Sequence, residues 1–235
     1  MRIKQEVIDI NEEQTLNFWE KRADRGLNLK TVLLNESLDD SIIRKRNFKE
    51  SDIVKSILPK QSSVLDIGCG IGRWADNLKE HISFYHGIDY TESLISIAKQ
   101  RFKENKNVDF IKMSASNIDK AMLRSQYDMT IITGVLMYIN DKNIPNLLNF
   151  IDNVTTDTIY VQESMSINTR LTLDNIYSEN LKDNYSAIYI TKEEYETFYK
   201  NNLKHFKIKK VDLLLDDDMA PHKETNAMYW ILKRI

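Results

Sequence analysis

Three glycines, Gly68, Gly70 and Gly72, lie within five residues of one another in a chain of 235 residues that contains only 6 glycines. An apolar stretch precedes them at 63–67, and a stretch with helical spacing follows at 73–81. Glycine allows backbone conformations and a close approach of ligand that a side chain would prevent. Backbone N–H groups at the start of a helix can also face a ligand. The segment is therefore predicted to form a strand, a ligand-binding turn and a helix.

Two acids flank this turn in the sequence. Asp66 stands two residues before Gly68, and Asp89 follows Gly68 by 21 residues, at the end of the next expected strand. An acid at that place can accept hydrogen bonds from both hydroxyls of a ribose. The dinucleotide pattern would need a third glycine where Arg73 stands, and the Asp66 carboxylate would repel a pyrophosphate. A nucleoside that carries an ammonium and a sulfonium group meets neither obstacle.

The segment VLDIGCGIGRW at 64–74 resembles the first motif of class I S-adenosylmethionine-dependent methyltransferases. The segment GIDY at 87–90 resembles their ribose-binding acid position. The resemblance covers residues 60–165 well and the last two expected strands in outline. It implies S-adenosyl-L-methionine as the cofactor and methyl transfer as the reaction. The cofactor contacts that it implies around the two motifs are Asp66, Gly68, Cys69, Gly70, Asp89 and Tyr90.

The resemblance also places residues after the third and fourth expected strands. Ser114, Ala115 and Ser116 correspond to the segment beside the adenine, with serine where the family often has an acid. Gly134 begins the segment that lines the methionine side of the cofactor. Tyr138 lies in that segment where the family often has histidine, so it is a catalytic candidate. Simple packing is the alternative for Tyr138.

An N-terminal helix is expected from a cap at Asn11, with Trp19 and Arg22 on one face. Such a helix could close over the cofactor, and Arg22 or Arg46 could pair with the cofactor's carboxylate. The alternative is a core tryptophan and a solvated arginine.

Two further residues are candidates for chemistry on the acceptor. His222 lies in a polar loop expected on the active-site side, and imidazole titrates near neutral pH, so it is a candidate base. A surface-loop histidine is the alternative. Glu163, just past the fifth expected strand, is a candidate for orienting the acceptor. The tyrosine-rich segment 164–201 is interpreted as a substrate lid, an irregular or helical insertion that could equally hold a small core of its own.

The acceptor class is narrowed by what the sequence lacks. Residues 133–136 read TGVL where adenine-N6 enzymes of this superfamily carry Asn/Asp-Pro-Pro and an aromatic residue. Cys69 lies in the cofactor turn, so it cannot serve as the nucleophile of cytosine-C5 chemistry. The leading prediction is methylation of an oxygen or nitrogen atom of a small polar molecule, such as a sugar or a secondary metabolite. The alternatives are an RNA or protein methyltransferase and a non-catalytic nucleoside-binding module.

Short apolar runs that alternate with amphipathic segments predict an α/β fold with a mostly parallel sheet. We expect a three-layer Rossmann-like sandwich with seven strands, the last of them antiparallel. An N-terminal helical cap (1–58), a cofactor-binding core (60–165), a lid insertion after strand five (165–204) and a closing hairpin (205–235) make one domain. Expected helices include 39–58, with a break near Asn47, and 118–124. The strands are expected at 63–67, 83–88, 109–113, 127–133, 158–162, 205–215 and 226–233.

Composition sets the remaining limits. Lys+Arg 33 against Asp+Glu 35 gives a formal net charge of -2, without the basic excess of a dedicated nucleic-acid binder. A single cysteine excludes an internal disulfide. No signal peptide or membrane span is expected, nor is a metal site, so a cytoplasmic monomer or homodimer is predicted.

Overall fold

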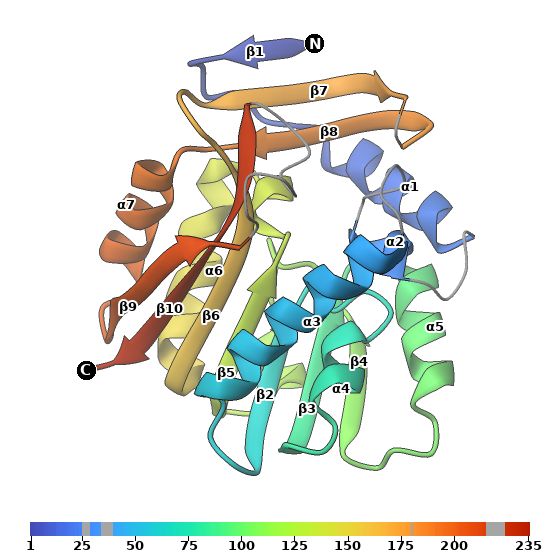
Figure 1. The fold of residues 1–235 in the computed structure, drawn as a ribbon, viewed down its shortest axis with the longest axis vertical. Helices are drawn as coiled ribbons and strands as arrows, with labels where there is room; N and C mark the ends of the chain where they lie inside the picture. The colour runs from blue at the N-terminus through green and yellow to red at the C-terminus, as the bar shows by residue number, and fades with distance from the viewer. Residues whose placement is uncertain (25–28, 34–39, 180, 215–223) are drawn as a thin grey trace.

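The computed structural model describes residues 1–24, 29–33, 40–179, 181–214 and 224–235. A seven-stranded sheet with the order β4-β3-β2-β5-β6-β10-β9 forms its centre (Figure 1). The strands are β2 (Ser62–Ile67), β3 (Ile82–Asp89), β4 (Val108–Lys112), β5 (Tyr127–Thr133), β6 (Thr155–Ser166), β9 (Phe206–Leu213) and β10 (Thr225–Arg234).

The direction of the strands agrees with the expected sheet. The pairs β2–β3, β3–β4, β2–β5 and β5–β6 are parallel. The last strand, β10, is antiparallel to both β6 and β9. Because a parallel sheet is covered on both faces, its strands are apolar almost throughout. Val64, Leu65 and Ile67 of β2 are fully buried, as are Ile131 and Ile132 of β5.

Helices cover the sheet on both faces and complete the expected three layers (Figure 1). On one face, α3 (Asp40–Ile57), α4 (Arg73–Leu78) and α5 (Glu92–Arg101) pack against the sheet in one apolar core. On the other face, α6 (Ile144–Val154) and α7 (Lys192–Asn202) enclose a second core. The helix α1 (Glu12–Ala23) and the short α2 (Leu29–Leu33) lie near the carboxyl edge of the sheet.

A second, three-stranded sheet crosses that edge (Figure 1). Its order is β1-β7-β8, from β1 (Arg2–Lys4), β7 (Leu171–Ser178) and β8 (Asp183–Tyr189), all antiparallel. The insertion after the fifth strand is therefore confirmed, but its expected irregular or helical character is wrong for β7 and β8. The helix α7, expected within the lid, instead belongs to the layer formed with α6.

Two expected features of the helices are also wrong. Only a 3-10 turn, Lys120–Met122, stands where a helix was expected at 118–124. None of its residues is buried, so no packing supports a longer helix. The expected break near Asn47 is absent from α3, which is continuous. The Asn47 side chain is occupied outside the helix, where its Oδ1 accepts from Arg73 and Asn77.

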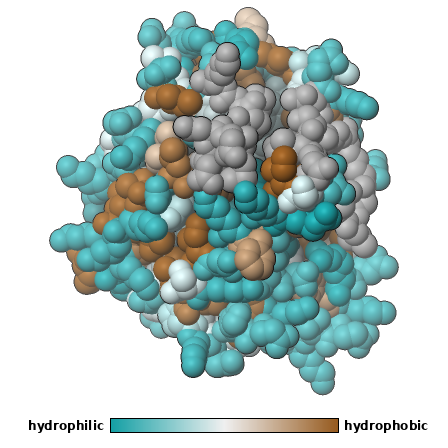
Figure 2. Space-filling model, viewed as in Figure 1, coloured by the Kyte–Doolittle hydropathy of each residue, from teal (hydrophilic) through white to brown (hydrophobic). Residues whose placement is uncertain are grey.

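A basic run at 204–210 leads into the edge strand β9. Its four lysines are all exposed: Lys204, Lys207, Lys209 and Lys210. Hydrophobic residues also gather on the side of the molecule where β9 and β10 lie (Figure 2). Within the described part of the chain, no helix combines the length and apolar character needed to cross a membrane.

Candidate active site

The carboxyl ends of four neighbouring strands meet at one cavity of about 450 Å³. Gly68 follows β2, Asp89 ends β3, Ser114 follows β4 and Gly134 follows β5, and all four residues line it. Parallel sheets bind ligands beyond the carboxyl ends of their strands for this geometric reason. Residues of β7 and β8 line the same cavity from the opposite side, so it extends from the glycine turn to the second sheet.

The glycine turn owes its shape to positive φ angles of +75° at Gly68 and +53° at Gly70. A Cβ atom at Gly68 would lie 2.3 Å from Cγ2 of Val135, so the turn and the segment after β5 pack without room for a side chain. The expectation that the turn's N–H groups face a ligand is wrong for Gly68 and Cys69, which both donate to the carbonyl of Ile88. The glycines therefore supply close approach, not free donors.

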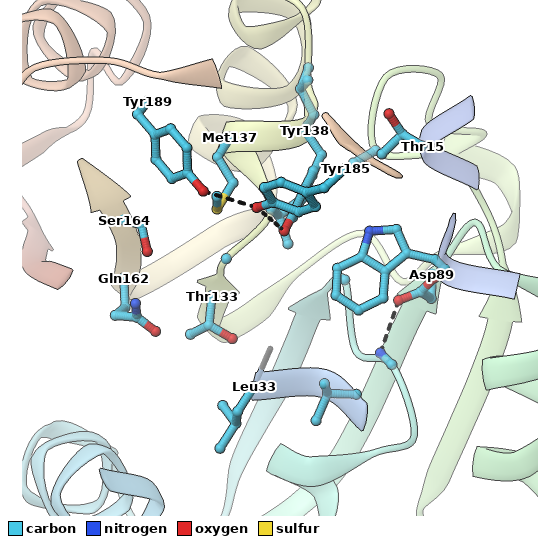
Figure 3. Close-up of a pocket in the computed structure, with 18 of the residues that line it drawn as sticks. Thr15, Leu33, Asp89, Thr133, Met137, Tyr138, Gln162, Ser164, Tyr185 and Tyr189 are labelled. Carbon is cyan, nitrogen blue, oxygen red and sulfur yellow. Dashed lines mark hydrogen bonds between the residues drawn. The ribbon is translucent and has the colours of Figure 1, made fainter. Parts of the chain in front are cut away.

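Asp89, the last residue of β3, is hydrogen-bonded to this turn (Figure 3). Its Oδ2 accepts from the backbone N–H of Gly70 at 3.0 Å, and its Oδ1 accepts from that of Thr91 at 2.9 Å. Burial raises the pKa of Asp89, although both hydrogen bonds oppose that shift. The carboxylate thus lies on the cavity wall and is oriented by the backbone on two sides.

Asp66 lies beneath the turn, not on the cavity wall. It is fully buried in β2, where the hydroxyl of Tyr85 donates to its Oδ2 and its Oδ1 has no partner among the described residues. Burial raises the pKa of Asp66 to about 7. The structure gives no direct contact from Asp66 to the cavity, so any influence on a ligand passes through the turn.

A positive pole borders the cavity at α3 and α4. Arg46 and Arg73 both line it, and both pair with the fully buried Glu50. Two guanidinium groups around one carboxylate leave a net positive charge beside the turn. Arg46 lines the cavity, but its guanidinium already pairs with Glu50, so its pairing with a cofactor carboxylate stays a prediction. Arg73 was considered only as a departure from the dinucleotide pattern.

The helix α1 begins at the expected cap, because the Asn11 side chain accepts from the N–H of Gln14. Glu20 fastens it to the core by accepting from the N–H groups of Glu92 and Ser93 at the start of α5. Trp19 lines the cavity and lies edge-on to Tyr138, with ring centroids 5.5 Å apart. Arg22 does not line the cavity. Its guanidinium donates to the carbonyl of Lys30, so the expected pairing of Arg22 with the cofactor is not what the structure presents.

Replacing Trp19 by alanine is expected to weaken the binding of S-adenosylhomocysteine roughly fivefold, because about 1 kcal/mol of aromatic contact is lost. Trp19→Phe should keep most of the affinity. Isothermal titration calorimetry measures both, and an alanine variant that binds like the wild type would support the packing account of Trp19.

Three tyrosines form the far end of the cavity (Figure 3). The hydroxyls of Tyr138 and Tyr185 are 2.9 Å apart, and those of Tyr185 and Tyr189 are 3.1 Å apart. Burial raises the pKa of all three phenols, so they stay protonated at neutral pH. Gln162 and Ser164 of β6 add polar groups nearby.

The two other candidates for acceptor chemistry differ from expectation. Glu163 lies inside β6, which continues to Ser166 because it pairs with β10 that far. Its carboxylate is fully buried, does not line the cavity, and accepts from backbone groups of Val135 and Leu136. The structure therefore does not place Glu163 where it could contact an acceptor in the cavity. His222 lies outside the described residues.

Most of the predicted site residues meet at this one cavity. Those that the sequence did not single out are the cavity-lining Arg73, Gln162, Tyr185 and Tyr189; only the tyrosine-rich composition of 164–201 pointed toward the last two. The predicted residues that line the cavity are Trp19, Arg46, Gly68, Cys69, Gly70, Asp89, Tyr90, Ser114, Ala115, Ser116, Gly134 and Tyr138.

Comparison with known proteins shows similarity to methyltransferases. Residues 64–157 match the family model described as a methyltransferase domain. A phosphoethanolamine N-methyltransferase of Zea mays is 26% identical over 144 residues, which are 60% of this chain and 28% of that protein. A ribosomal RNA small subunit methyltransferase A of Clostridium botulinum is 23% identical over 67% of this chain and 54% of that protein. The chain thus spans between a quarter and just over half of the length of these relatives.

Solved structures share the fold. A SAM-dependent methyltransferase of Leishmania major superposes with a TM-score of 0.73 at 18% identity, covering 94% of this chain and 82% of that one. A Haemonchus contortus phosphoethanolamine N-methyltransferase, solved with phosphoethanolamine and S-adenosylhomocysteine, gives 0.70 at 18% identity, over 95% of this chain and 49% of that one.

The chain shares its fold with solved S-adenosylmethionine-dependent methyltransferases, and its glycine–acid cavity lies at the carboxyl edge of the sheet. Residues 64–157 carry the match to the methyltransferase domain, and the Haemonchus contortus structure of the same fold holds S-adenosylhomocysteine.

Proposed function

We propose that this chain transfers a methyl group from S-adenosylmethionine to a nitrogen atom of a small polar molecule. The observation that carries the proposal is one continuous cavity, with the cofactor turn at one end and the three-tyrosine wall at the other. Its volume of about 450 Å³ is typical of a small-molecule site. Methyl transfer needs mainly alignment of the acceptor with the methyl group, and an enclosed cavity supplies it.

The residues present fit the cofactor. A Cβ atom built at Gly134 meets nothing within 4 Å, so the backbone there is open to a ligand, and Asp89 stands where a ribose would need an acid. Asp89 would hold the ribose, Ser114 and Ser116 the adenine edge, and Arg46 the carboxylate. When bound, S-adenosylmethionine supplies an activated methyl group on a sulfonium. The tyrosine wall would then orient the acceptor and exclude water.

The chemistry of the tyrosine wall favours nitrogen over oxygen. A hydroxyl acceptor needs a general base, which accelerates transfer about 10²–10⁴-fold, whereas the lone pair of a neutral amine is nucleophilic enough to react without one. Among the described residues that line the cavity, no histidine occurs, and the carboxylates are Glu12, Asp89 and Glu224. Glu224 pairs with Arg2 and Lys4. Neutral phenols can accept a hydrogen bond from an amine N–H and leave its lone pair free.

The test combines binding and transfer. Wild-type protein should bind S-adenosylhomocysteine in calorimetry and should transfer labelled methyl from S-adenosylmethionine to small amines. Matched alcohols, with hydroxyl in place of the amine, should be labelled poorly. Labelling confined to RNA or to protein would instead favour those alternatives, and absence of S-adenosylhomocysteine binding would contradict the cofactor assignment.

His222 separates the nitrogen and oxygen proposals. With an amine acceptor, His222→Ala is expected to slow single-turnover methylation less than tenfold. A loss of two orders of magnitude or more would identify His222 as a base and favour a hydroxyl acceptor. The cytoplasmic location and the monomeric or dimeric state stay predictions.

A further inference from the structure

Glu163 of β6 caps the short turn that follows the neighbouring strand β5. Its Oε1 accepts from the backbone N–H groups of Val135 and Leu136, both at 2.9 Å. These groups lie at the start of the 3-10 turn Leu136–Tyr138, where backbone donors have no partner within the turn itself. One carboxylate oxygen therefore satisfies two consecutive donors, at the position before the turn and at its first residue.

That segment carries residues that belong to both ends of the cavity. Gly134 precedes the turn on the cofactor side, and its N–H donates to the carbonyl of Gln162 at 2.8 Å. Tyr138 ends the turn and begins the hydroxyl chain of the tyrosine wall. Residues 162 and 163 of β6 thus accept the backbone hydrogen bonds of residues 134–136, which join the cofactor end of the cavity to the acceptor end.

The position of Glu163 is unfavourable for stability. Its carboxylate is fully buried, and its Oε2 has no hydrogen-bond partner among the described residues. Burial, and then the charge of Glu163, raise the pKa of Tyr195 and Tyr199 of α7. The hydroxyls of these tyrosines also lack hydrogen-bond partners in the described part of the chain. Burial raises the pKa of Glu163 to about 7. A buried carboxylate with one unpaired oxygen lowers the stability of the fold. Stability therefore does not explain why a glutamate stands here, whereas its hydrogen bonds to the turn do.

We propose that Glu163 is a positioning residue, which holds the turn Leu136–Tyr138 so that Gly134 and Tyr138 face one cavity. The consequence for ligand binding rests on the proposed function. The clamp on the turn stands on the two hydrogen bonds alone.

Local hydrogen exchange and ligand affinity test the clamp in the full chain. Glu163→Leu removes the acceptor, so we expect the amides of Val135 and Leu136 to exchange at least tenfold faster. S-adenosylhomocysteine should bind at least tenfold more weakly in calorimetry. Glu163→Gln keeps an oxygen at the same distance and should stay within threefold of the wild type in both measurements. If the leucine variant does not fold, Glu163→Asp, which is one methylene shorter, should show the same two losses.

Val161→Ala is the matched control, because Val161 is also fully buried in β6 and points to the same face. It should destabilise the protein without local acceleration at 135–136. Wild-type exchange and affinity in folded Glu163→Leu would overturn the clamp, and so would an equal effect of Val161→Ala. A wild-type protein that does not bind S-adenosylhomocysteine would contradict the proposed function, while the exchange measurement would still decide the clamp.

Discussion

Asp89→Ala is expected to weaken the binding of S-adenosylhomocysteine at least tenfold. The substitution removes the acid proposed to hold the ribose hydroxyls, and it also releases the N–H groups of Gly70 and Thr91. Hydrogen bonds to a charged group contribute about 1.5–3 kcal/mol each, and about 1.4 kcal/mol corresponds to a tenfold change in affinity. Loss of one ribose contact alone therefore reaches the predicted size.

Calorimetry of three variants checks this prediction. Asp89→Asn should bind with intermediate affinity, because its amide keeps one acceptor oxygen. Asp109→Ala serves as the control, since Asp109 lies in the adjacent strand β4 with an exposed side chain and does not line the cavity. It should bind like the wild type. Unchanged affinity in Asp89→Ala would remove Asp89 from the binding site.

The cofactor half of the site was predictable because local sequence and sheet geometry act together. Apolar runs mark buried parallel strands, and the residues that follow them necessarily meet at the carboxyl edge. Gly68, Asp89, Ser114 and Gly134 could therefore be placed at one site without any knowledge of long-range contacts.

The acceptor half was not predictable in the same way. The strands β7 and β8 contain polar residues and tyrosines, and no glycine or proline marks the turn between them. The pairing of β7 with β1, which comes from the far end of the chain, depends on tertiary structure. Glu163 was misplaced for a similar reason: the pairing of Ser166 with Thr225 extends β6 beyond its apolar run.

Arg73→Met is expected to lower the free energy of unfolding by about 3–5 kcal/mol, because it leaves a buried carboxylate without its main partner. Glu50 is fully buried between Arg73 and Arg46. Burial alone would raise the pKa of Glu50, but the charges of Arg73 and then Arg46 hold it below its usual value. The methionine variant keeps an unbranched apolar stem but removes the guanidinium, together with its hydrogen bond to Asn47 and its contact with the Trp74 ring.

Denaturant unfolding of a small set of variants separates this effect from simple packing. Arg44→Met, an exposed substitution on the helix α3 that also carries Glu50, should change stability by less than about 0.5 kcal/mol. Glu50→Gln combined with Arg73→Met should recover part of the loss, because the fully buried side chain at position 50 then carries no charge. Additive losses in the double variant would contradict the proposed pairing.

The pH dependence of the unfolding free energy tests the same ion pair independently. In the wild type, the lowered pKa of Glu50 contributes stability above the unfolded value, and this contribution is lost as the pH falls through the folded value. Without Arg73, burial should dominate and raise the pKa of Glu50, so protonation should then favour the folded state. The difference in stability between wild type and Arg73→Met should therefore be largest at neutral pH and should narrow toward pH ~4, near the usual glutamate pKa. A difference that stays constant with pH would show that the loss comes from packing and not from the buried charge.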